Sequence, residues 1–140
     1  MGGRDWIHGP GLPGNCPVFT SESLTRIEEL AAELNELAEK TRERRISPAD
    51  MEGGTFTISN VSMLGMDGFT PVLNPPETGI LGVGRVIEKP AVFNGEIAIR
   101  QMMMLSLTYD HRLIDGAPAA RFLQRVKQLV ERPFALVLGG

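Results

Sequence analysis

The chain has 140 residues, a length that fits one domain, and its 42% hydrophobic and 22% charged residues are typical of a soluble globular protein. A net charge of −3 gives no bulk attraction to a polyanion, and the apolar run Phe134–Leu138 is far too short to span a bilayer. The single cysteine, Cys16, cannot form an internal disulfide, which favours a reducing compartment.

The first elements follow from the spacing of Gly, Pro and apolar residues. Residues 1–16 are expected to be irregular, because glycines and prolines interrupt any periodicity. A helix is predicted from about Ser21 to Arg45, because apolar residues recur there at steps of three and four positions. These residues are Leu24, Ile27, Leu30, Ala31, Leu34, Leu37 and Ala38.

The middle of the chain combines a short turn, a strand and a long loop. Ser47–Asp50 predicts a single capped helical turn with Pro48 at its first position. Thr55–Ser59 alternates and is rich in β-forming residues, so it is predicted to be a strand. Residues 60–78 carry five Gly and Pro residues and predict a long loop, which in a small domain is often functional.

The last third of the chain predicts a hairpin and a helix. Strands over Gly79–Glu88 and Ile97–Tyr109 flank the dipeptide Asn94-Gly95, the strongest short signal for a hairpin turn. The run Met102–Leu105 is nearly continuous apolar sequence, typical of a strand covered on both faces. A helix is predicted at about residues 118–131. Together these elements predict an α+β fold with a mainly antiparallel or mixed sheet and helices packed on one side.

One segment, Asp110–Gly116, combines residues suited to chemistry. It lies where the apolar strand is predicted to end and the last helix to begin, a place where rigid scaffolds present catalytic groups. His111 has charged neighbours in Asp110, Arg112 and Asp115, which can set its tautomer and its charge. Taken alone, a salt-bridged turn explains the segment as well as a catalytic site does.

A family resemblance changes that balance. Ser106–Gly116 closely resembles the C-terminal signature of the dihydrolipoamide acyltransferases of 2-oxo acid dehydrogenase complexes, and Gly53–Asn60, Pro71–Glu77 and Gly79–Gly84 resemble further segments of that family in the same order. A lone His-x-x-x-Asp-Gly is weak, because chloramphenicol acetyltransferases and peptide-synthesis condensation domains share it. Four segments in order are specific. The resemblance implies a chloramphenicol acetyltransferase-like fold.

The resemblance implies an acyl transfer between the thiols of dihydrolipoamide and coenzyme A, the latter a substrate. His111 would accept the thiol proton, because a thiol near pH 7 is only a few per cent thiolate. Ser59 would donate a hydrogen bond to the oxyanion that forms. Asp115 would shape the active-site turn and hold charge near His111. The alternatives are that Ser59 is an ordinary outward strand residue and that Asp115 only caps the last helix.

The resemblance also implies what surrounds these residues. Residues 17–140 match the C-terminal part of an acyltransferase catalytic domain, and residues 1–16 are an irregular segment that resembles none of its elements. The lipoyl group would be carried on a domain absent from this chain. The implied partners are a homotrimer within a larger symmetric core, lipoyl domains and the dehydrogenase components, with no nucleic acid, membrane or metal. The expected location is the cytoplasm, or the mitochondrial matrix in a eukaryote.

Two functions remain open at this point. One is the acyltransferase itself, and the other is a truncated core subunit that assembles without turnover. Intact His111, Ser59 and Asp115 favour the first, and the N-terminally incomplete domain favours the second. A chloramphenicol-type acetyltransferase is a weaker third alternative. Acetyl is the preferred acyl group, with branched-chain acyl and succinyl open. Because part of the sheet would be absent, the isolated chain is expected to fold and turn over poorly.

Overall fold

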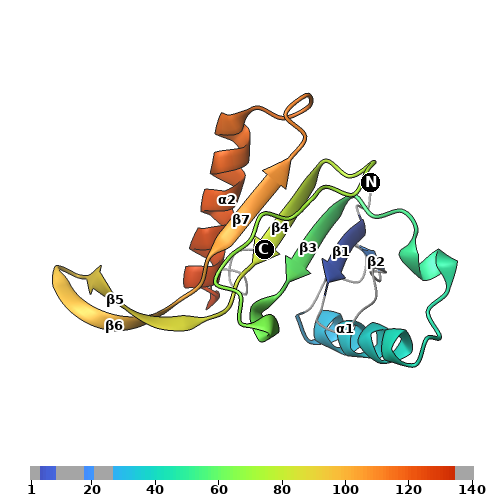
Figure 1. Ribbon diagram of the computed structural model, residues 1–140, viewed down its shortest axis with the longest axis horizontal. Coiled ribbons are helices and arrows are strands. Elements are labelled where there is room, and N and C mark those ends of the chain that lie inside the picture. The colour runs from blue at the N-terminus through green and yellow to red at the C-terminus, as the bar shows by residue number, and fades with distance from the viewer. Residues whose placement is uncertain (1–3, 9–17, 21–26, 135–140) are drawn as a thin grey trace.

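A five-stranded sheet carries the fold, and the computed structural model describes residues 4–8, 18–20 and 27–134. The strands, in the order in which they lie side by side, are β2 (Val18–Thr20), β1 (Arg4–His8), β3 (Phe56–Asn60), β4 (Gly79–Val83) and β7 (Leu105–Tyr109) (Figure 1). A hairpin of β5 (Ile87–Phe93) and β6 (Glu96–Met102) projects away from the sheet. The helices are α1 (Ile27–Arg42) and α2 (Gly116–Glu131), with short 3-10 turns η2 (Pro48–Met51) and η3 (Ser62–Leu64).

The strand directions make the sheet mixed. β1, β3 and β4 run parallel to one another, whereas β2 and β7 are antiparallel to their neighbours. Parallel strands are usually covered on both faces. Accordingly, the first four residues of β4 are buried. The predicted α+β fold with a mixed sheet and two helices is confirmed.

The expectation that residues 1–16 are irregular is wrong for Arg4–His8. This segment forms β1 inside the sheet, antiparallel to β2 on one side and parallel to β3 on the other. Its register places Asp5 beside Phe56 and His8 beside Ser59. A five-residue strand between glycine-rich stretches is too short to show a period, so only its pairing with β3 reveals it. The rest of the predicted segment lies outside the described residues.

The predicted amphipathic helix is confirmed as α1, but it ends before Arg45. Its predicted start at Ser21 lies outside the described residues. Arg44 takes a left-handed backbone conformation, with φ of 57°. The N–H of Arg45 then bonds the carbonyl of Lys40, and that of Arg44 bonds the carbonyl of Thr41. These are the two hydrogen bonds of a Schellman motif, whose usual sequence signal, a glycine, is absent here.

Two predicted turns are confirmed. Ser47 and Asp50 form a capping box at η2, in which each side chain bonds the other residue's backbone N–H. Asn94 and Gly95 have φ angles of 53° and 85°, and they join β5 to β6. Positive φ at both central residues is the requirement of the tight hairpin turn that this dipeptide predicts.

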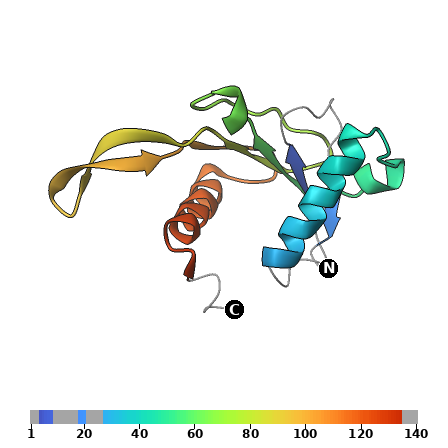
Figure 2. The same ribbon diagram turned by 90° about the horizontal axis from the view of Figure 1, so that it is seen from below.

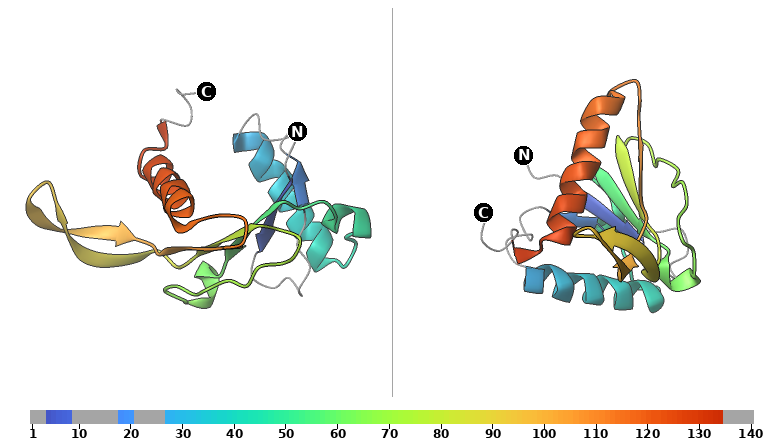
Figure 3. Two further views of the ribbon diagram at one scale, coloured as in Figure 1. Left: turned by 90° about the horizontal axis from the view of Figure 1, so that it is seen from above. Right: turned by 90° about the vertical axis from the view of Figure 1, so that its left-hand side faces the viewer.

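The two faces of the sheet have different cover. α2 packs along β7, and the rings of Phe56 on β3 and Phe122 on α2 lie with their centroids 5.6 Å apart. Figures 2 and 3 show α2 on one side of the sheet, whereas α1 begins on that same side and runs obliquely to the level of the strands near β1. We call the α2 side the helix face and the other side the loop face.

The loop face is covered by residues 61–78, the predicted long loop. Three strand hydroxyls hold this loop: Ser106 donates to the Phe69 carbonyl, Thr108 donates to the Pro71 carbonyl at 2.8 Å, and Thr57 donates to the Glu77 carboxyl group. Thr57 and Glu77 are both buried. The loop is therefore held against the sheet by side-chain hydrogen bonds and forms a layer over it.

Each of the two long strands predicted over Gly79–Glu88 and Ile97–Tyr109 is two strands. The chain leaves the sheet after Val83, and it returns before Leu105. At this exit, Gly84 donates its N–H to the Met104 carbonyl, and Arg85 donates to the Met66 carbonyl. The loop therefore takes part of the hydrogen bonding that would continue β4 into β5.

The expectation that Met102–Leu105 is a strand covered on both faces is wrong in this chain. Met102, Met103 and Met104 have exposed fractions of 44%, 37% and 57%. They connect the projecting hairpin to β7 and so lie where the chain has left both covering layers. A continuous apolar segment must be covered to be stable in water, but its sequence does not show whether the same chain or another chain covers it.

Candidate functional site

The candidate site is built on a short turn between β7 and α2. Asp110 donates its backbone N–H to the Thr78 carbonyl at 3.0 Å, which fixes the start of the turn to the end of the loop beside β4. The Asp110 carbonyl accepts the N–H groups of Leu113 and Ile114, each at 3.0 Å. The turn is therefore held by backbone bonds on both sides of His111.

His111 itself is exposed. Its ring lies 5.5 Å from the ring of Tyr109, centroid to centroid, with a tilt of 39°. Tyr109 is the last residue of β7 and pairs with Gly79 of β4. The imidazole therefore lies on an ordered strand end and remains open to a reacting group from outside the chain.

Asp110 and Arg112 form an ion pair across His111 in the sequence. The Arg112 Nε and Nη2 donate to the two carboxylate oxygens of Asp110, at 2.9 Å and 2.6 Å, and the Arg112 backbone N–H donates to Oδ1 at 3.0 Å. These guanidinium bonds, followed by the backbone bond, lower the pKa of Asp110 to about 2. The salt-bridged turn that the sequence allowed is present, on the same residues as the candidate catalytic group.

Asp115 occupies the N-cap position of α2, as one interpretation of the sequence predicted. Its carbonyl accepts the N–H of Ala119, but its side chain makes no capping hydrogen bond. The carboxyl group is exposed and belongs to the same turn as His111. Because only its backbone caps the helix, the Asp115 carboxyl group is not used in capping and can interact with groups outside the turn.

Ser59 lies on the loop face of the sheet. It pairs with Gly82, which pairs with Ser106, and directly paired residues point to the same face. A Cβ at Gly82 would lie 2.5 Å from the Ser106 hydroxyl and 3.2 Å from the Phe69 ring, so this row faces the loop. Ser59 is half-buried there, next to a position where only glycine leaves room.

One chain does not bring Ser59 and His111 together. The row of Ser59 crosses β7 at Ser106, and His111 lies beyond the end of β7 at Tyr109. The three residue steps from Ser106 to Tyr109 span about 10 Å at roughly 3.3 Å per step, before the spacing between strands is added. A single reacting group therefore cannot contact both side chains of the same chain.

The Thr57–Glu77 contact was not predicted from the sequence. Thr57 is one of two threonines in the predicted strand Thr55–Ser59, and Glu77 follows the Pro75-Pro76 pair of the loop. They are 20 positions apart, and nothing in either segment marks them as partners. A buried polar pair of this kind becomes visible only once the loop is placed on the sheet.

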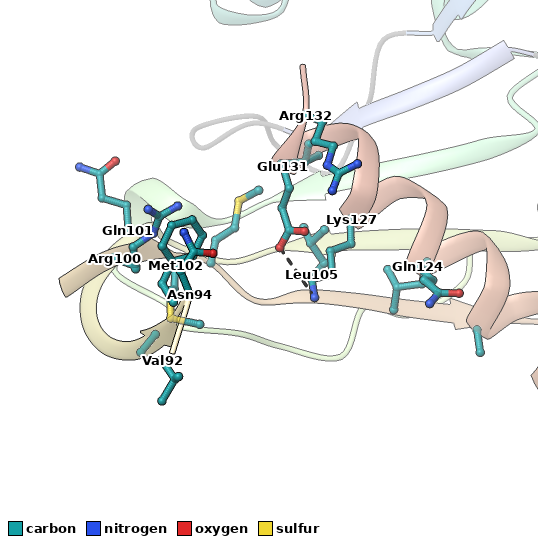
Figure 4. A pocket seen from close by; sticks show the side chains of 16 residues that line it. Val92, Asn94, Arg100, Gln101, Met102, Leu105, Gln124, Lys127, Glu131 and Arg132 are labelled. Atoms are coloured by element: carbon teal, nitrogen blue, oxygen red, sulfur yellow. Dashed lines mark ion pairs between the residues drawn. The ribbon is translucent and has the colours of Figure 1, made fainter. Parts of the chain in front are cut away.

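The hairpin and α2 enclose an open groove of about 1150 Å³ (Figure 4). Its walls include Arg100 and Met102 from the hairpin and Gln124 and Lys127 from α2, and Lys127 pairs with Glu131 at 3.7 Å. It contains none of Ser59, His111 and Asp115. The groove is therefore separate from the candidate site.

No three His, Cys, Asp or Glu side chains within residues 4–8, 18–20 and 27–134 gather as a metal site. No helix among these residues has the length and apolar character needed to cross a membrane.

Comparison with known proteins places these residues among acyltransferases. The sequence profile of the family described as 2-oxoacid dehydrogenases acyltransferase (catalytic domain) matches residues 16–138. The chain is 46% identical over 123 residues to the dihydrolipoyllysine-residue acetyltransferase component of the acetoin cleaving system of Bacillus subtilis. It is 42% identical over 122 residues to the dihydrolipoyllysine-residue succinyltransferase component of the mitochondrial 2-oxoglutarate dehydrogenase complex of Bos taurus. Each match covers 87% of this chain but only 31% and 27% of the relatives' own lengths.

Solved structures agree with the sequence matches. A structure of the dihydrolipoamide acetyltransferase of Azotobacter vinelandii superposes with a TM-score of 0.89 at 38% identity. That protein was investigated for the role of a serine, a histidine and an asparagine in its catalytic mechanism. The cubic core of a pyruvate dehydrogenase multienzyme complex superposes equally well, at 37% identity. Each comparison covers 98% of this chain and 57% of the solved chain.

Proposed function

Since the chain belongs to the family of 2-oxoacid dehydrogenases acyltransferase catalytic domains, we propose that it moves an acyl group between dihydrolipoamide and coenzyme A. The observation that carries this proposal is the position of His111, an exposed imidazole held at the end of a fixed strand. Coenzyme A and the lipoyl group are substrates in this proposal, and the lipoyl group is carried on a separate domain.

The spacing of the candidate residues supports their roles. The serine and histidine investigated in the Azotobacter vinelandii enzyme are separated by as many positions as Ser59 and His111. The asparagine follows its histidine at the same interval at which Asp115 follows His111. Asp115 differs from that asparagine in charge, so it is proposed to shape the turn and hold charge near His111, without a proton-transfer role.

The proposed reaction balances with one base and one donor. His111 accepts the proton of the coenzyme A thiol as the sulfur bonds to the thioester carbon of acyl-dihydrolipoamide. The carbonyl oxygen becomes an oxyanion, to which the Ser59 hydroxyl donates a hydrogen bond. The intermediate then collapses, the bond to the dihydrolipoamide sulfur breaks, and that sulfur takes the proton back from the imidazolium.

The separation of Ser59 and His111 within one chain leads to a shared site. We propose a homotrimer in which His111 of one subunit and Ser59 of the next face the same thioester, within a larger symmetric core. Closed cyclic symmetry makes each such site equivalent. The relation to cubic-core structures supports an assembly of this kind. Lipoyl domains and dehydrogenase components are its proposed partners.

The acyl group and the location of the protein are also proposals. Acetyl is the first acyl group to test, and succinyl is the second, because relatives are named for each. The proposed location is the cytoplasm, or the mitochondrial matrix in a eukaryote; the Bos taurus relative is named as mitochondrial. The alternative function is a core subunit that assembles without turnover. The chain spans less than a third of the length of these two relatives.

The test uses mixed subunits of the assembled protein. His111→Ala and Ser59→Ala are each assayed alone and after mixing, with free dihydrolipoamide and acetyl- or succinyl-coenzyme A. We expect each variant alone to be strongly impaired and the mixture to regain part of the activity, because some sites then combine an intact His111 with an intact Ser59.

Three results bear on different parts of this proposal. Near-normal turnover by His111→Ala alone would remove the assignment of the base. Absence of recovery despite proven subunit exchange would remove the shared site. An unaltered protein that assembles and binds substrate but does not turn over would favour the structural alternative. Glu36→Gln, at an exposed residue of α1 that pairs with Lys40, is the matched control.

A further inference from the structure

The residues on either side of His111 are bonded to each other. Asp110 and Arg112 are joined by guanidinium bonds, and the Arg112 backbone N–H also donates to the Asp110 carboxylate. Asp110 is in turn fixed to the Thr78 carbonyl through its own N–H. The hydrogen bonds between residues 110 and 112 therefore hold the backbone on both sides of His111, and the bond to Thr78 ties that backbone to the end of the loop.

The two partners of the pair differ in burial. The side chain of Asp110 is only 16% exposed, whereas that of Arg112 is 88% exposed. An exposed guanidinium contributes little free energy through the ion pair alone. The bond from the Arg112 backbone N–H to the carboxylate is different, because it fixes the peptide that follows His111.

We propose that Asp110 is a positioning residue that aims the His111 imidazole, and that Arg112 neutralises its carboxylate so that His111 can act as a base; this inference rests on the proposed function. A misplacement of about 1 Å at a reacting group can cost roughly a hundredfold in rate. A carboxylate beside an imidazole favours its protonated form, which cannot accept the thiol proton. In the pair, the Asp110 carboxylate still accepts the hydrogen bond that fixes the backbone after His111, and the Arg112 guanidinium cancels the negative charge of that carboxylate.

Other titratable groups lie around the turn. Tyr109 contacts the His111 ring from the end of β7, and Asp115 lies at the start of α2. Glu77 adjoins Thr78 on the loop, but its carboxyl group accepts the Thr57 hydroxyl. The pair formed by Asp110 and Arg112 is the one whose charges flank His111 directly along the chain.

Four substitutions in the assembled protein separate geometry from charge. Asp110→Ala removes both the acceptor and the charge, and Asp110→Asn keeps an acceptor oxygen but removes the charge. Arg112→Gln leaves the carboxylate without its cation, and Arg112→Lys restores a cation. Turnover of free dihydrolipoamide and acetyl-coenzyme A is measured against pH at low ionic strength, where the charges are least screened.

Removing the cation and removing the carboxylate are expected to shift the pH–rate profile in opposite directions. Asp110→Ala lowers kcat roughly 10- to 100-fold with little change in KM, because the base is misaligned in a site that still binds substrate. In Arg112→Gln, the acidic limb of the pH–rate profile moves to higher pH. In Asp110→Asn, it moves to lower pH, because a lone guanidinium remains. Arg112→Lys returns the limb toward its original position.

The proposal is overturned if thermal unfolding shows folded variants whose kcat and pH profile match those of the Glu36→Gln control. It is also overturned if all four variants lose kcat in proportion to a lowered melting temperature, with an unchanged pH profile, because a purely structural pair would behave in that way. His111→Ala in the same assay separates the two proposals. Retained activity there defeats the assignment of the base, whereas lost activity with unaffected Asp110 variants defeats only the positioning role.

Discussion

At the scale of single residues, hydroxyl groups on the strands connect the fold to the candidate site. Thr57, Ser106 and Thr108 all point to the loop face and hold the loop that ends at Thr78. Thr78 in turn accepts the N–H of Asp110, at the start of the turn that carries His111. The position of the imidazole therefore depends on polar contacts within a buried layer.

The Thr57→Val substitution tests that layer. It removes the donor to the buried Glu77 carboxyl group at nearly constant side-chain volume. We expect a loss of about 1–3 kcal/mol in the free energy of unfolding, because a buried acceptor loses a hydrogen bond. Thr108→Val is the matched comparison, since its hydroxyl bonds a neutral carbonyl, and it is expected to cost about 0.5–1.5 kcal/mol. Chemical denaturation measures both, and equal costs would contradict the argument.

The Ser59→Ala substitution tests the donor to the oxyanion. One such donor is typically worth about a hundred- to a thousandfold in kcat. Because the base remains, we expect Ser59→Ala to retain more activity than His111→Ala in steady-state assays. Ser106→Ala, in the same row of the loop face, changes a hydroxyl that bonds the Phe69 carbonyl, and is expected to affect stability more than kcat. A larger loss for Ser106→Ala in kcat would contradict the role of Ser59.

The low pKa of Asp110 predicts the sign of a pH effect on stability. Its pKa is lowered from 3.8 to about 2 in the folded protein by the Arg112 bonds. A carboxyl group whose pKa is lower when folded stabilises the protein above its unfolded pKa, and that contribution is lost as pH falls through the folded pKa. The unfolding free energies of the parent and Asp110→Asn should therefore converge between pH 3.8 and about 2. A constant difference over that window would contradict the assignment.

At the scale of elements, one glycine decides where β4 ends. A Cβ at Gly84 would lie 2.1 Å from the backbone carbonyl oxygen of Asp67, a contact that no side-chain rotation relieves. The loop can cover the sheet at this point only because residue 84 has no side chain.

The Gly84→Ala substitution is expected to destabilise the protein by about 1–3 kcal/mol, because overpacking forces the loop backbone away from the sheet. Gly116→Ala is the control, since its Cβ would meet the Tyr109 hydroxyl at an ordinary 3.5 Å. Melting temperatures and unfolding free energies of the two variants should differ accordingly. A Gly84→Ala protein as stable as Gly116→Ala would show that the loop is not held at this point.

At the scale of the whole molecule, apolar side chains are unevenly covered. Among the residues whose burial is described, the buried hydrophobic side chains are Leu37, Ile80, Leu81 and Ala119. One face of the hairpin presents paired apolar residues with exposed fractions of 75% for Val92, 82% for Ile97 and 74% for Ile99. A patch of this kind on a projecting arm is typical of an interface.

The isolated chain is therefore expected to associate or aggregate and to turn over poorly. Each Å² of apolar surface left in water forgoes about 25 cal/mol, against a typical net stability of only about 5–15 kcal/mol for a domain. The measurements are molar mass in solution, thermal unfolding and acyl transfer. A monodisperse monomer that melts cooperatively and turns over normally would contradict the prediction.

The Ile97→Glu and Ile99→Glu substitutions localise that association to the hairpin. Both residues lie on the same face of β6 and are exposed, so charges there should leave the fold intact and oppose burial against a second copy. We expect lower molar mass at a given concentration, with an unchanged circular dichroism spectrum. The exposed Glu36→Gln control should leave the molar mass unchanged.

The sequence by itself determined the local structure and the candidate residues. The apolar spacing of α1 and α2, the capping box at Ser47 and the turn at Asn94-Gly95 each depend on neighbouring residues in the chain, so their patterns predict them. The order of motifs identified the family, with His111 in its signature segment. The helices, the capping box and the turn depend on the backbone preferences of single residues and on contacts between neighbours in the chain, so they can be read from the sequence.

Only the tertiary structure decided how these parts combine. It placed β1 between β2 and β3, divided each predicted long strand at the hairpin exit, and exposed the Met102–Met104 run. It also set Ser59 and His111 at different positions along the strands, too far apart to act within one chain. The physical reason is that pairing partners, register and cover depend on contacts between distant segments. A short strand needs pairing partners and an apolar run needs other residues packed over it, and only the folded arrangement shows which segments provide them.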